Sequence, residues 1–71
     1  MAIKAQVGET AGEVWRLLKS DGPQTMAQLR KKLKRTSELL SFAVGWLARE
    51  DQVDIIEKKK SPRVEYLVQL K

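Results

Sequence analysis

The sequence predicts an α+β fold in which three helices precede a β-hairpin. Two observations predict this fold. Between residues 10 and 50, apolar residues recur at helical spacing in three separate segments. From residue 53 onward the pattern changes to the two-residue alternation that is typical of strands. The chain has 71 residues, the size of one small domain. We therefore treat residues 1–71 as a single domain.

The composition argues against several classes of function. The chain has no Cys and no His, which excludes disulfides, thiol catalysis and the common zinc sites. No apolar segment approaches the ~20 residues of a membrane span, and the N-terminus lacks the apolar stretch of a secretion signal. The sequence also shows no Gly-rich phosphate loop and no pair of acids set in an obvious pocket. We expect a soluble cytoplasmic protein that is not an enzyme and has no cofactor, metal or small-molecule ligand.

The first two expected elements are an N-terminal arm and a helix. Residues 1–8 form the arm, because Ile3–Val7 alternates apolar and polar residues, as a short strand or an ordered extended segment does. The helix covers residues 10–20, because Thr10–Glu13 has the spacing of a capping box. Ser20–Pro23 ends it, since Gly tolerates a left-handed cap and Pro cannot continue a helix.

Two further helices follow with a short connection between them. The second is expected over residues 25–34, where Thr25–Gln28 is again a capping-box pattern. The third is expected over residues 37–50, with Ser37 as the N-cap and Glu38 complementing the helix dipole in the first turn. Two short helices joined in this way are typical of a helix-turn-helix.

The remaining element is a β-hairpin over residues 53–70, whose strands are joined by a basic loop at residues 58–63. One face of the hairpin is expected to point into the core and the other to carry a cross-strand pair. The inward set is Val53, Ile55, Val64 and Tyr66, and the outward pair is Ile56 with Leu67. Three helices followed by such a hairpin are the winged helix arrangement, with the hairpin as the wing.

Two motifs also carry a resemblance to a known family. GETAGEVW, residues 8–15, opens the first helix, and GWLARED, residues 45–51, closes the third. Both resemble a family of small prokaryotic winged helix-turn-helix domains of unassigned function. The resemblance extends over nearly the whole chain and implies a winged helix-turn-helix fold. It implies DNA binding, and a part in transcription regulation, by analogy between folds alone.

The positive charge of the chain is concentrated in two places. The formal net charge is +5 and the sequence pI is about 9.8. Nine of the 14 Lys and Arg residues lie in residues 30–35 and 58–63. In a winged helix these two segments flank the third helix and can both reach a DNA backbone. Two solvated basic surfaces are the alternative, but convergence on one expected face favours double-stranded DNA as partner.

The third helix offers little for reading bases. Its core face is expected to be Leu40, Ala43, Val44 and Leu47. The opposite side, Glu38, Ser41, Gly45 and Arg49, offers one carboxylate, one hydroxyl and one guanidinium. The guanidinium of Arg49 lies at the C-terminal end, whereas base contacts usually come from the N-terminal part of a recognition helix. Gly45 lies mid-helix at a cost of ~1 kcal/mol relative to Ala. That cost favours a packing role for Gly45 over close approach of a partner.

A second apolar stripe on the third helix consists of Leu39, Phe42 and Trp46. The sequence favours cover by the N-terminal arm or the hairpin, because so small a domain needs every apolar contact. The alternative is an interface with another protein or with a second copy of the chain, since large exposed apolar patches are uncommon on monomers. The two interpretations stay open at this point.

The functional hypothesis is therefore a DNA-binding winged helix protein that resembles transcription regulators, and the alternative is a protein-interaction or homodimerisation module. The expected nucleic-acid contacts are Lys31, Lys34, Arg35, Ser37, Ser41, Arg49, Lys58, Lys59, Lys60 and Arg63. The expected protein interface is Leu39, Phe42 and Trp46.

Overall fold

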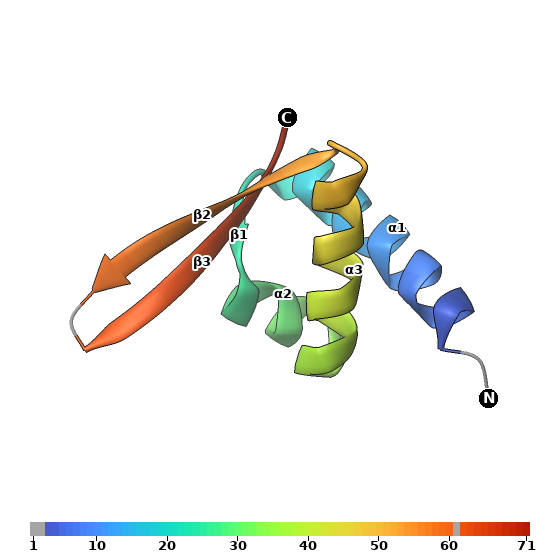
Figure 1. Ribbon diagram of the computed structural model, residues 1–71, viewed down its shortest axis with the longest axis horizontal. Coiled ribbons are helices and arrows are strands. Elements are labelled where there is room, and N and C mark those ends of the chain that lie inside the picture. The colour runs from blue at the N-terminus through green and yellow to red at the C-terminus, as the bar shows by residue number, and fades with distance from the viewer. Residues whose placement is uncertain (1–2, 61) are drawn as a thin grey trace.

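The computed structural model describes residues 3–60 and 62–71 and confirms three helices followed by a hairpin (Figure 1). In chain order the elements are α1 (Lys4–Asp21), β1 (Gln24–Thr25), α2 (Met26–Leu33), α3 (Ser37–Arg49), β2 (Val53–Lys60) and β3 (Arg63–Leu70). The helices form one body, and β2 and β3 project from it as a wing.

Helix α1 begins earlier than the sequence predicted. The amide of Val7 donates a hydrogen bond to the carbonyl of Ile3 at 3.0 Å, so the segment expected as an arm forms the first turns of the helix. Thr10 is fully buried within the helix and is not its cap. Val7 and Ala11 continue the apolar stripe of α1 toward the N-terminus, and this helical spacing outweighs a short alternation. The arm and the capping box at Thr10 were wrong predictions, and residues 1 and 2 lie outside the described part.

The ends of the helices are fixed by local hydrogen bonds. Gly22 ends α1 with a φ of 80°, and its amide donates to the carbonyl of Leu18 at 3.0 Å, as the predicted stop requires. Thr25 and Gln28 form the predicted capping box of α2. At α3 the cap is Thr36, whose hydroxyl accepts from the amide of Leu39 at 3.2 Å. The prediction of Ser37 as the cap was therefore wrong by one residue.

The sheet joins the wing to the helices. Its strand order is β1-β3-β2 with both pairs antiparallel. Val68 of β3 lies opposite Gln24 on one side and Ile55 on the other, and it is fully buried. The sheet therefore closes the core at its inner end. The core consists of Ala11, Val14, Leu18, Leu29, Leu40, Ala43, Val44, Leu47, Val53 and Val68.

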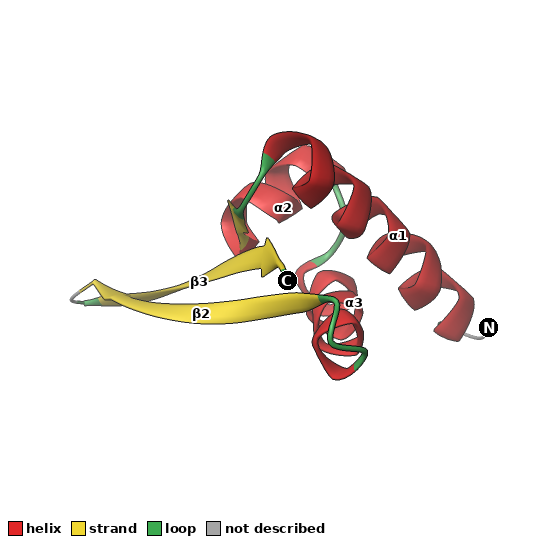
Figure 2. Ribbon diagram, turned by 90° about the horizontal axis from the view of Figure 1, so that it is seen from above, coloured by secondary structure: helices red, strands yellow, loops and turns green. Residues whose placement is uncertain are grey.

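The outer part of the wing extends past this core (Figures 1 and 2). Ile56 and Leu67 are a cross-strand pair, as predicted. Of the residues expected to point inward, only Val53 is buried, while Ile55, Val64 and Tyr66 are 43%, 47% and 46% exposed. The two-residue alternation assigned Ile55, Val64 and Tyr66 to the same strand face as Val53, which is correct. The helices do not cover that face where these three residues lie. The cations expected in a loop lie in the strands, because β2 runs to Lys60 and β3 begins at Arg63.

Candidate nucleic-acid interface

A concave surface lies between the helix-turn-helix and the wing. Three adjoining hollows of about 310, 210 and 200 Å³ share Met26 and Tyr66 in their walls. Helices α2 and α3 form one side of this surface and the wing forms the other. Its polar lining is Thr25, Arg30, Ser37, Ser41, Arg63, Glu65 and the half-exposed Tyr66. We call this surface the wing groove.

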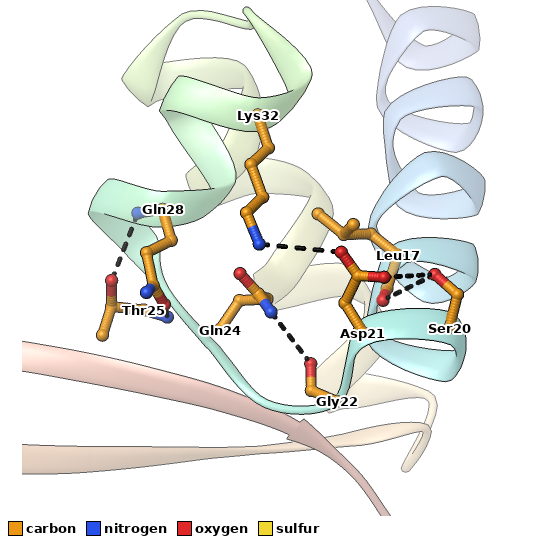
Figure 3. Close-up of polar contacts among 8 residues, drawn as sticks. All are labelled: Leu17, Ser20, Asp21, Gly22, Gln24, Thr25, Gln28 and Lys32. Carbon is orange, nitrogen blue, oxygen red and sulfur yellow. Dashed lines mark hydrogen bonds and ion pairs between the residues drawn. The ribbon is translucent and has the colours of Figure 1, made fainter.

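The helix-turn-helix fixes the polar groups on its side of the wing groove. The capping box sets where α2 begins: Gln28 donates its amide to the Thr25 hydroxyl at 3.1 Å, and Thr25 donates its amide to the Gln28 side chain at 2.8 Å (Figure 3). One turn later, Arg30 donates a hydrogen bond from Nη1 to Ser37 Oγ at 3.1 Å. This bond crosses from α2 to the start of α3 and places a guanidinium beside a hydroxyl at the rim of the groove.

Strand alternation distributes the cations of the wing over both faces of the hairpin. Lys59 pairs with Val64 across the hairpin, so its side chain lies on the same strand face as Tyr66. Lys58 lies opposite Glu65 in the strand register, on the other face of the hairpin. Arg63 lines the outer hollow. Lys58, Lys59 and Arg63 are all exposed. The side chain of Lys60, also expected to contact nucleic acid, lies outside the described part of the chain.

Arg35 serves a structural purpose that the sequence did not show. Its Nε and Nη2 donate to the two carboxylate oxygens of Glu13 at 2.9 and 2.8 Å, and Nη2 also donates to Glu9 at 2.8 Å. The hydrogen bond from Arg35 holds the pKa of Glu13 below its ordinary value, and the bonds from Glu13 and then Glu9 raise the pKa of Arg35. Arg35 thus links the α2–α3 turn to α1, and we remove it from the expected nucleic-acid contacts.

The other cations divide according to their partners. Lys32 lies 3.6 Å from Asp21 of α1 (Figure 3). Among the described residues, neither Lys31 nor Lys34 has a carboxylate within 4.0 Å, and the same is true of the described wing cations and of Arg49. Arg49 is the last residue of α3 and lies outside the wing groove. The unpaired cations of α2 and the wing therefore remain available to an anionic partner.

The three residues of the second apolar stripe of α3, Leu39, Phe42 and Trp46, differ in how far they are buried. Leu39 is 8% exposed and belongs to the interior, so it is not available as an interface anchor. Phe42 and Trp46 are 52% and 50% exposed. Cover by an arm or by the hairpin, which the sequence favoured, is therefore wrong for both aromatic residues. The packing role favoured for Gly45 is wrong too, because a Cβ placed on Gly45 would meet nothing within 4 Å.

Arg30 and Tyr66 line the wing groove and can donate hydrogen bonds to phosphate, but they were absent from the predicted contacts. Tyr66 was assigned to the core because its strand alternation points inward, and the sequence does not reveal that the wing extends beyond the helices. Arg30 was recognised within the basic cluster but was not selected. It follows Met26 by four residues and Ala27 by three, so it shares their face of α2, which only the structure shows to be the groove face.

Two features are absent from the described residues 3–60 and 62–71. These residues contain no helix that is both long and apolar enough to cross a membrane. Nor do they contain a group of three or more acidic side chains placed to hold a metal ion.

Comparison with known proteins agrees with this architecture. A family model described as Winged helix-turn-helix domain (DUF2582) matches residues 1–66. The uncharacterized protein MJ1608 of Methanocaldococcus jannaschii is 36% identical over 58 residues, which cover 78% of this chain and 81% of that protein. No solved structure gives a significant match. The family resemblance seen in the sequence is thereby confirmed, and the chain belongs to the winged helix-turn-helix domain family DUF2582.

Proposed function

We propose that this protein binds double-stranded DNA through the wing groove, as a module that resembles transcription regulators. One observation carries the proposal: unpaired cations from two segments far apart in the sequence border the same concave surface. Arg30 lies on its helical side and Arg63 on its wing side. Within residues 30–35, the cations with carboxylate partners are Lys32 and Arg35, and both are tied to α1. A winged helix family supports the same partner.

The chemistry of the groove favours contacts with phosphate over contacts with bases. Arg30, Lys59 and Arg63 can neutralise phosphates, and the hydroxyls of Ser37, Ser41 and Tyr66 can donate hydrogen bonds to phosphate oxygens. Helix α3 presents no exposed Asn or Gln, and its Arg49 lies outside the groove. We therefore expect binding that weakens with salt and depends little on sequence.

An NMR titration of isotope-labelled protein with a mixed-sequence duplex tests the proposal. We expect amides of residues 27–41 and 57–66 to shift together, and the shifts to weaken between about 50 and 200 mM salt. Titration with a second duplex of unrelated sequence should move the same amides. Absence of shifts at the lower salt concentration would overturn the proposal.

A pair of matched variants separates the groove from net charge. Lys59→Gln with Arg63→Gln removes one Lys and one Arg from the wing, and Lys4→Gln with Arg16→Gln removes the same two residue types from exposed positions of α1 outside the groove. The wing variant should reduce the slope of log K against log salt by about 2. The α1 variant should leave that slope nearly unchanged. Equal losses would show that total charge, rather than the groove, accounts for binding.

A further inference from the structure

The outer face of α3 is apolar in the middle and oppositely charged at its two ends. Glu38, Phe42, Gly45 and Arg49 follow one another at intervals of four, three and four residues, so they lie on one line along the helix, opposite the core. Trp46 lies beside this line. Figure 2 shows α3 at the edge of the molecule, with α1, α2 and the wing on its other sides.

This face suits another protein surface better than DNA. Half-exposed Phe42 and Trp46 are typical anchors of protein interfaces. Glu38 at the start of the helix would repel phosphates. The unpaired cations of the wing groove lie on other elements, and of the four residues on this line only Gly45 also borders the groove. Phe42 and Trp46 therefore need a partner other than the DNA backbone.

The pattern of the face is complementary to itself when two copies run antiparallel. A register that places Glu38 of one copy beside Arg49 of the other also places Phe42 beside Gly45 of the other, because both pairs are centred between residues 43 and 44. Gly45 has no side chain, and the space where its Cβ would lie is open, so it leaves room for the phenyl ring. The spacing of four, three and four residues along Glu38, Phe42, Gly45 and Arg49 is also that of the residues in contact between paired helices. A parallel pair would instead place like charges together.

We propose that two copies of this chain associate through α3, paired antiparallel about a two-fold axis. Phe42 of each copy packs over Gly45 of the other, Glu38 pairs with Arg49 at both ends, and Trp46 extends the apolar contact along one flank. Since α3 has 13 residues and is about 20 Å long, the contact is smaller than a standard interface of about 1,600 Å². The dimer should therefore dissociate in the micromolar range. This proposal does not rest on the proposed DNA binding, although Gly45 also borders the wing groove.

Sedimentation equilibrium over a range of concentrations, with charge-reversal variants, tests this pairing. Glu38→Arg alone places Arg against Arg at both ends of the pair, and Arg49→Glu alone places Glu against Glu. Each variant should dissociate about tenfold more readily than the unaltered protein. An equimolar mixture of the two variants contains attractive pairs at both ends, so the mixture should recover the original association.

The recovery cannot come from a more stable helix. Glu38 near the N-terminus and Arg49 near the C-terminus both favour the helix dipole, so each reversal weakens α3 slightly. Mixing does not restore either residue. Circular dichroism will confirm that each variant is folded, and Glu57→Arg in the wing is the matched control, which should leave association unchanged. A protein that stays monomeric at millimolar concentration, or a mixture that does not recover, would overturn the proposal.

Discussion

Arg35 binds two carboxylates of α1, although its place in a run of cations predicted a contact with phosphate. Residues 30–35 contain five cations and one Leu, and the acidic residue nearest to Arg35 in sequence, Glu38, is not its partner. Its partners, Glu9 and Glu13, are 26 and 22 residues away along the chain. A bidentate pair of this kind is geometrically demanding and fixes the α2–α3 turn against α1. At the scale of single residues, tertiary partners therefore divide the structural cations from those available for binding.

The pair predicts how stability depends on pH. The pKa of Glu13 is lowered in the folded state, so its stabilising effect is fully present above the ordinary value of 4.5 and is lost as the pH falls through the lowered value. Glu13→Gln should lower Tm by about 5 °C at pH 7. The difference in Tm between the two proteins should then shrink below pH 4.5.

Thermal unfolding followed by circular dichroism between neutral pH and about pH 3 measures this difference. Glu57→Gln in the wing serves as control, because Glu57 is exposed and forms no ion pair with any described residue. If the difference in Tm between the unaltered protein and Glu13→Gln stays constant down to the lowest pH measured, Glu13 does not account for the pH dependence.

Single helices show how far local patterns determine structure. The capping box at Thr25 and the stop at Gly22 both form as predicted, because each depends only on residues within one turn. The start of α1 does not follow its local pattern. Thr10 and Glu13 have capping-box spacing, but the helix continues past them because its apolar stripe extends back to Val7. Where a cap and a packing stripe conflict, packing on the core sets the helix end.

Two glycines allow opposite predictions for the same substitution. Gly45→Ala should increase the free energy of unfolding by about 0.5–1 kcal/mol, because an added Cβ meets nothing within 4 Å and Ala favours a helix. Gly22→Ala should lower it by about 1 kcal/mol, because the φ of 80° suits Gly and strains Ala. Urea unfolding at protein concentrations well below the micromolar range, where association is negligible, measures both. A loss of stability in Gly45→Ala would indicate a packing role after all.

The whole molecule is a small helical body with a wing that projects beyond it. Its dimensions are 39 × 24 × 21 Å, and the long axis includes the outer wing. Val53 and Val68 anchor the inner end of the hairpin in the core, whereas the outer residues contact mainly each other. This shape creates the wing groove and exposes its lining.

The shape predicts a gradient of stability along the hairpin. Amides of residues 57–66 that face across the hairpin should exchange with solvent faster than that of Val68, because only the inner end is held by the core. Leu29 should exchange as slowly as the most protected residues, since its helix packs in the core. Hydrogen exchange followed by NMR tests both. Equal protection along β3 would contradict a wing that is held only at its base.

The sequence by itself determined the α+β class, the order of the elements and most helix ends, because these depend on apolar periodicity and turn residues that act locally. The family followed from the resemblance of the two motifs at residues 8–15 and 45–51. The sequence also placed the basic segments of α2 and the wing. Only the tertiary structure decided which cations are free, that Tyr66 lines a groove, and that Phe42 and Trp46 are exposed while Leu39 is buried. Those properties depend on contacts between residues far apart in the chain and on how far the helices cover the wing. A pattern of neighbouring residues in the sequence contains no information about either.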